Sequence, residues 1–164
     1  MSRNYLPEYA ENARLALAIA EKEAAHLGYS HRTLYAHAID LQWVEALRQR
    51  DDLSEKIDAF VGRFGRLQDH IGEKLIPRFA ALVGENTKTM LDALAFAERM
   101  EWIEDAEVFF GARKLRNLLV HEYLTDPALF LEALQAADQA AQMLLVTVAR
   151  IARYAENIGL SNSP

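Results

Sequence analysis

The stretch DPALFLEALQAADQAAQMLLVTVARIARYAEN, residues 126–157, carries a long helical pattern with no glycine inside it. Thr125 or Asp126 can cap its first turn, and Pro127 suits the first helical position. Gly159 lies just beyond its end, where helices commonly stop. A long helix of this kind favours a fold in which several helices pack side by side.

Helical periodicity continues outside this stretch, and no alternation of β-branched and aromatic residues lasts for six residues. We expect five more helices, at Leu6–His26 (ended by Gly28), His31–Gln49 (capped by Ser30), Leu53–Val83, Thr87–Met100 and Glu101–Tyr123. The predicted fold is therefore an all-α, antiparallel up-down bundle of five to six helices.

The segment Leu53–Val83 contains Gly62, Gly65 and Gly72, and then Pro77. Each glycine costs a helix about 1 kcal/mol relative to alanine. Their number indicates a helix that approaches a neighbour closely through its small residues. Pro77 is expected to kink or break this helix.

The composition indicates one folded domain over residues 1–164. The chain is 51% hydrophobic and 26% charged, with a net charge of −6. Residues 1–50 could be an N-terminal elaboration, and residues 159–164 a frayed tail. The acidic balance argues against a protein that coats nucleic acid non-specifically, but it permits one local basic site.

The sequence predicts a cytoplasmic protein without a membrane span, a metal or a cofactor. It has no cysteine, which excludes disulfides and thiolate metal sites. The apolar run at Leu15–Ala20 is too short for a signal peptide and is followed by charged residues. The run at Leu144–Ala149 is far too short to cross a bilayer.

The stretch RKLRNLLVHEY, residues 113–123, is the main functional candidate. On an ideal helix Asn117 and His121 share one face, and Arg116 and Tyr123 share another. The purely structural alternative is a helix end whose cations complement the dipole and whose histidine bonds the last carbonyls. Charge and periodicity alone leave both interpretations open.

Arg116, Asn117, His121 and Tyr123 form the pattern Arg-Asn-x3-His-x-Tyr. This pattern resembles the signature of the HEPN superfamily, specifically its HepT-like branch. The likeness covers roughly Phe60–Arg153 and includes the segment RFGRLQDHIGEKLIPRF, residues 63–79, which is similar to the second-helix region of HepT-like proteins.

The resemblance implies a metal-independent endoribonuclease, the toxin of a toxin–antitoxin pair whose antitoxin is a minimal nucleotidyltransferase. His121 would act as general acid or base, and Arg116 would stabilise the charge on the phosphorane. Asn117 would orient the phosphate or His121. Tyr123 would be the residue to which the antitoxin transfers AMP.

The helix geometry also favours a homodimer. Arg116 and His121 lie about 140° apart on an ideal helix, so one helix presents them poorly to a single phosphate. A two-fold axis beside the helix would bring a second copy of each residue into a shared cleft, and the resemblance implies such a dimer too.

Other residues have weaker functional interpretations. Arg113, Lys114 and Arg66 could extend an RNA-binding surface, although Arg66 and Asp69 could equally form a minor surface pair. The other histidines (His26, His31, His37 and His70) are expected to be surface residues. The acidic residues of EWIEDAE, residues 101–107, indicate a solvated helix start rather than a metal or glycosidase site.

Three functions therefore remain open. The chain could be a HepT-like ribonuclease toxin, the non-catalytic substrate-binding subunit of a two-component nucleotidyltransferase, or a helical interaction protein with a decayed site. The intact pair of Arg116 and His121 favours the first over the third, whereas the net negative charge counts against an RNA substrate.

Overall fold

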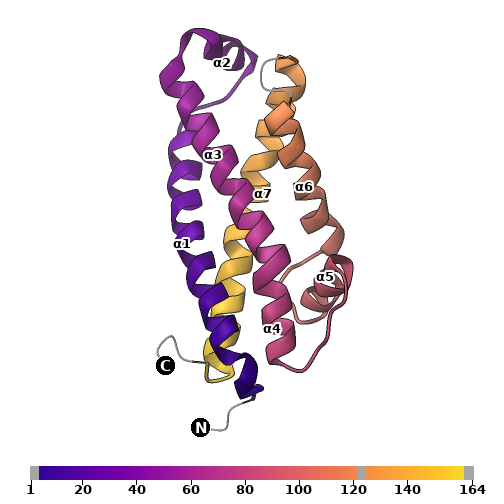
Figure 1. Ribbon diagram of the computed structural model, residues 1–164. Helices are drawn as coiled ribbons and strands as arrows, with labels where there is room; N and C mark the ends of the chain where they lie inside the picture. Colours follow the sequence, from indigo (N-terminus) through magenta and orange to yellow (C-terminus); the bar gives the residue numbers. More distant parts are fainter. Residues whose placement is uncertain (1–3, 122–124, 161–164) are drawn as a thin grey trace.

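Four long helical rods run alternately up and down in the computed structural model, which describes residues 4–121 and 125–160 (Figure 1). The rods are α1 (Ala10–Leu34), α3 (Asp51–His70) continued by α4 (Ile76–Leu82), α6 (Ala106–His121) and α7 (Pro127–Asn157). α1 and α6 each pack against both α3 and α7. The expected all-α up-down bundle is confirmed, and no strand occurs among the described residues.

Short elements close the two ends of the bundle (Figure 1). At one end, α2 (Leu41–Ala46) and η2 (Leu47–Gln49) connect α1 to α3. At the opposite end, a 3-10 turn, η1 (Pro7–Tyr9), leads into α1, and α5 (Met90–Arg99) connects α4 to α6. Within the described ranges, no helix is long and apolar enough to span a membrane.

The predicted helix boundaries near Gly28 are wrong. α1 continues through Gly28 to Leu34, because its buried side, which includes Leu27 before the glycine, continues beyond it to Leu34. Ser30 does not cap a helix; its Oγ accepts a hydrogen bond of 2.7 Å from Arg63 Nη1. The real cap is Asp40, whose carboxylate accepts the Trp43 N–H at 2.8 Å and starts the short α2.

The expected helix over Leu53–Val83 is confirmed as one rod that runs from Asp51 to Leu82. A π-helical turn, η3 (Ile71–Leu75), lies between α3 and α4, and the Ile76 N–H bonds to the carbonyl of Ile71, five residues back. Pro77 has no N–H to donate, so a register change just before it keeps the rod helical instead of breaking it.

Gly84 and Gly159 end α4 and α7 in the left-handed region, with φ of 89° and 80°. After Gly159 the chain stays attached to the bundle. Leu160 is 4% exposed, and its N–H bonds to the Ala155 carbonyl at 2.9 Å. The expected frayed tail therefore does not include residues 159 and 160; residues 161–164 lie outside the described part of the chain.

The N-terminal helix belongs to the core of the bundle. Ala13, Ala16 and Ala20 of α1 are fully buried, and α1 packs along both α3 and α7. Their small side chains let the backbone of α1 approach its neighbours closely.

Candidate functional site

α6 begins at Ala106, because the carboxylate of Asp105 caps its first turn. Asp105 Oδ1 accepts the N–H groups of Glu107 and Val108 at 2.8 and 3.2 Å. The acidic stretch is therefore a helix start, as expected, although the helix begins later than Glu101. No group of His, Cys, Asp or Glu among the described residues could hold a metal ion.

The inner side of α6 is apolar, and it fixes which residues point outward. Phe109, Ala112 and Leu119 are at most 4% exposed and pack in the core. Trp102, just before α6, is also buried, at 1% exposed. This packing leaves the opposite side of α6 facing solvent.

The exposed side of α6 is both basic and apolar. Six of its exposed residues lie within an arc of about 120° on a helix and are here named the α6 outer face: Phe110, Arg113, Lys114, Asn117, Val120 and His121. Phe110 and Val120 are 46% and 54% exposed, which is unusual for large apolar side chains between cations. The sequence-predicted Asn117 and His121 thus lie together, and Arg113 and Lys114 lie beside them.

Arg116 points away from this face and lies against α3. Its Nη1 donates to Asp69 Oδ2 at 2.8 Å, and about a third of each side chain remains exposed. A Cβ atom built on Gly65 would overlap Arg116 Nε and would lie 2.9 Å from Arg116 Cζ. Only glycine at this position leaves room for the guanidinium on the surface of α3.

The expected close approach through glycine is therefore confirmed at Gly65. It also holds at Gly72, where a Cβ would lie 3.3 Å from Met90 Cε. Gly62 is different, because the nearest atom to its Cβ position is Arg66 Nη1 at 3.5 Å, on the same helix.

The suggested pair of Arg66 with Asp69 does not form. Asp69 pairs with Arg116, whereas Arg66 Nε lies 3.5 Å from Glu23 Oε2 on α1. Gly65 and Asp69 are four residues apart and share one face of α3. This spacing of a glycine and an aspartate is the feature of the sequence that could have indicated the position of Arg116. Arg66 faces α1 and so lies apart from the α6 outer face.

His121 makes no hydrogen bond or ion pair with any other residue that the structure describes. Its exposed imidazole is free to bind a ligand. Tyr123 lies outside the described residues, so its predicted role rests on the sequence pattern alone.

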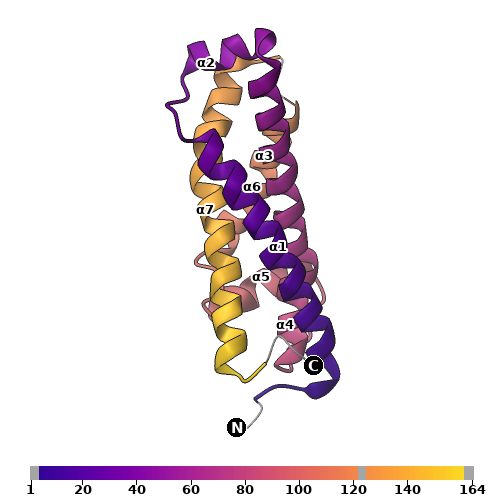
Figure 2. The same cartoon turned by 90° about the vertical axis from the view of Figure 1, so that its left-hand side faces the viewer.

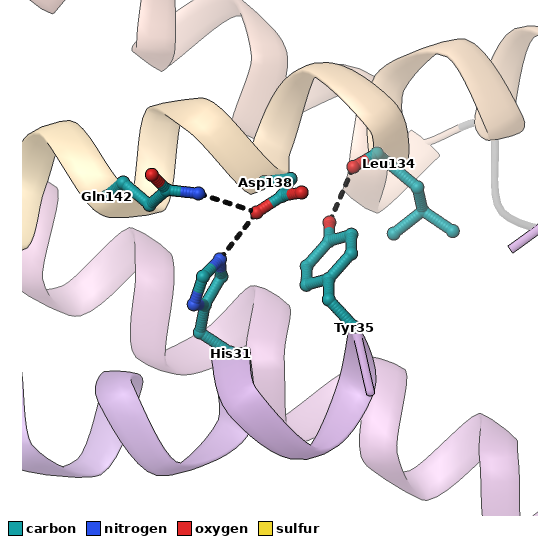
Figure 3. A network of polar contacts seen from close by, with 5 residues as sticks. All are labelled: His31, Tyr35, Leu134, Asp138 and Gln142. Atoms are coloured by element: carbon teal, nitrogen blue, oxygen red, sulfur yellow. Dashed lines mark hydrogen bonds and ion pairs between the residues drawn. The ribbon is translucent and has the colours of Figure 1, made fainter. Parts of the chain in front are cut away.

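A separate polar network ties α1 to α7 (Figure 3). His31 Nε2 lies 2.7 Å from Asp138 Oδ1, which also accepts from Gln142 Nε2 at 3.0 Å. The hydroxyl of Tyr35, one turn beyond His31, donates to the Leu134 carbonyl. Both rings come from the end of α1 and reach across to α7, so this network holds two core helices in register.

Two of the expected surface histidines are therefore structural. The side chain of His31 is only 15% exposed, and His70 Nε2 lies 2.7 Å from the Ala16 carbonyl. His26 and His37 are exposed, as predicted.

Comparison of the chain with protein-family models, with curated proteins and with solved structures found no match.

Gly65→Ala tests the packing of Arg116. In an open helix this change stabilises by about 1 kcal/mol, but here the new methyl group must displace the guanidinium from Asp69. We expect Gly65→Ala to lower the free energy of unfolding, measured by denaturant titration. In an Arg116→Ala background the same change should be neutral or stabilising. Gly62→Ala is the control and should stabilise in both backgrounds; equal gains at Gly62 and Gly65 would contradict the packing described.

Tyr35 should make the fold sensitive to alkali. Burial, and secondarily the charge of Asp138, raise the pKa of Tyr35 above its usual value near 10. As pH rises beyond about 10, the unfolded chain loses a proton that the folded chain keeps, so stability falls by up to about 1.4 kcal/mol per pH unit. Tyr35→Phe should be less stable at pH 7 but should lose stability less steeply between pH 10 and 11. Tyr29→Phe, at a residue 61% exposed, should keep the parent slope. Equal slopes for Tyr35→Phe and the parent would refute this role.

Proposed function

We propose that the chain is a metal-independent endoribonuclease of the HEPN type, a HepT-like toxin that uses Arg116 and His121 at the end of α6. The observation that carries the proposal is the arrangement of these two residues. Asp69 and the space above Gly65 hold Arg116 in place, while His121 is exposed and unpaired among the described residues. A fixed cation and a free imidazole, brought to the same phosphate, are sufficient to promote cleavage of a phosphodiester.

The chemistry follows from the two side chains. His121 can accept the proton of the ribose 2′-hydroxyl, or donate one to the departing 5′-oxygen. The attack of the 2′-oxygen on phosphorus gives a phosphorane with added negative charge. Arg116 can stabilise that charge, because its guanidinium has five N–H donors and the bond to Asp69 occupies Nη1 only. Asn117, exposed on the same face as His121, can orient the phosphate.

The α6 outer face fits single-stranded RNA in its chemistry. Arg113 and Lys114 supply two cations next to Asn117, and the exposed ring of Phe110 offers a surface for a base to stack on. This local basic surface supports an RNA substrate in spite of the net charge of −6. Arg113 also contacts α5, with Nη1 at 3.7 Å from the Met90 sulfur, which limits its motion.

A second copy would complete the site. Arg116 reaches α3 while His121 faces solvent, so the two side chains of one α6 diverge. A two-fold axis next to the end of α6 would place Arg116 of each copy near His121 of the other, and it would cover the exposed Val120. The cleft proposed here is therefore shared between two copies.

The proposed partner is a minimal nucleotidyltransferase antitoxin. Tyr123 follows His121 by two residues, so an AMP group on its hydroxyl would bring a bulky anion close to the catalytic residues. Such a group would repel the RNA phosphate and block access to His121.

Expression of the chain alone in bacteria tests the function. We expect growth arrest and RNA loss with the parent, and at least about 100-fold less RNA cleavage with His121→Ala or Arg116→Ala. His37→Ala, which removes an exposed histidine elsewhere, is the matched control and should remain toxic. Toxicity of His121→Ala equal to that of the parent would exclude the proposed site. A harmless parent that binds a nucleotidyltransferase tightly would instead favour the substrate-binding subunit.

The shared cleft predicts that two inactive variants complement each other. Purified Arg116→Ala and His121→Ala should each be inactive. After dissociation and mixing, about half of the dimers would contain one copy of each, and each such dimer would have one intact site. RNA cleavage should therefore recover to about a quarter of the parent rate. Mixing that restores nothing, with both variants folded and dimeric, would show that a shared site of this kind is absent.

A further inference from the structure

α1 has a second apolar stripe on the side that faces away from the bundle. Leu15, Ile19 and Tyr29 are 54%, 38% and 61% exposed, and Ala18 and Ala25 are exposed between them. In Figure 2 the outer side of α1 faces the viewer, and no other element lies across it. A bundle helix is usually polar on its solvent side, so an apolar stripe here indicates a surface that binds something.

Four of the five apolar residues of this stripe follow the spacing of a coiled-coil seam, and Ile19 lies beside it. Steps of four and three residues connect seven positions, here named the α1 seam: Glu11, Leu15, Ala18, Lys22, Ala25, Tyr29 and Arg32. The two alanines lie on either side of the centre, where small side chains allow two helices to approach closely. The seam thus has the shape to receive one more helix.

The α1 seam is complementary to itself when it is reversed. In an antiparallel pair Glu11 would face Arg32 of the second copy, and Leu15 would face Tyr29 of the second copy. Ala18 would then meet Ala25, and the two central Lys22 side chains would each have a Glu21 of the other copy beside them. A parallel pair would instead place Glu11 against Glu11 and Arg32 against Arg32, which repel.

The charged residues on and beside the seam are free to pair with a second copy. Within the described residues, none of Glu11, Glu21, Lys22 and Arg32 forms an ion pair inside the chain. Glu11 and Arg32 are 21 residues apart on one helix, about 32 Å, so they cannot neutralise each other within one copy. Only a second, antiparallel seam brings them together.

We propose that the outer side of α1 binds the α1 of a second copy of this chain, antiparallel and across a two-fold axis. α1 and α6 lie at opposite corners of the bundle (Figure 1), so this contact leaves the α6 outer face open. The inference is independent of the proposed function. If the copies also pair through α6, the two contacts together give a larger assembly, because each copy then has two neighbours.

Sedimentation of charge-reversed variants tests the seam. The parent should self-associate as its concentration rises from about 1 to about 200 µM, the range of modest interfaces. Glu11→Arg and Arg32→Glu should each weaken this association by at least about tenfold, because both end pairs become repulsive. An equimolar mixture of the two variants should associate again. In a mixed pair one copy has a cation at both ends of its seam and the other copy has a carboxylate at both ends, so both end pairs attract.

Glu55→Arg, at an exposed site on α3, is the control and should associate like the parent. All four proteins should unfold at similar denaturant concentrations, because exposed substitutions usually change stability by no more than about 0.5 kcal/mol. Pairing through α6 would raise every mass equally and would leave the order of the variants unchanged. A parent that stays at one mass over the whole range would overturn the inference. So would a mixture of variants that fails to associate.

Discussion

The contact of Arg116 with Gly65 and Asp69 links α6 to α3. The guanidinium lies where a Cβ on residue 65 would be, and the carboxylate of Asp69 binds it at 2.8 Å. A larger residue at position 65 would have to displace this guanidinium from Asp69. The buried inner side of α6, with Phe109 and Leu119 in the core, turns His121 outward. The absence of a side chain at residue 65 thus sets where Arg116 lies, and core packing sets where His121 lies.

The sequence predicted best those features that local chemistry determines. The bounds of α7 follow from Asp126, Pro127 and Gly159, each of which acts on the backbone near it. The helical segment from Asp51 to Leu82 was also predicted, but no break occurs at Pro77, because a π-helical turn precedes it.

At other positions, burial and tertiary contacts outweigh the structure that the local sequence favours. Gly28 looked like a helix end, but it is buried within α1, where the packing of Leu27 and Leu34 outweighs its weak helix propensity. Arg66 and Asp69 looked like partners because they are one turn apart. Each instead pairs with a different helix, and no pattern within a single helix reveals such tertiary contacts. His31 and His70 were expected at the surface for the same reason. Their hydrogen-bond partners are distant in sequence, so their structural roles could not be predicted.

The α6 outer face and the α1 seam differ in charge, and this difference suggests different ligands. The α6 outer face combines cations with Asn117 and His121, which suits an anionic ligand such as RNA. The α1 seam has an acidic residue at one end and a basic residue at the other, which suits a second, antiparallel copy of itself. The net charge of −6 describes neither face. Local arrangement, rather than composition, is what distinguishes the two faces.

The ends of the RNA products test the central claim most directly. If His121 and Arg116 promote attack by the ribose 2′-oxygen, the purified chain should cut single-stranded RNA in the presence of a metal chelator. The products should carry 2′,3′-cyclic phosphate and 5′-hydroxyl ends, and His121→Ala should yield none of them. Products with 5′-phosphate ends, cleavage that requires a divalent metal, or equal cleavage by His121→Ala would contradict the account.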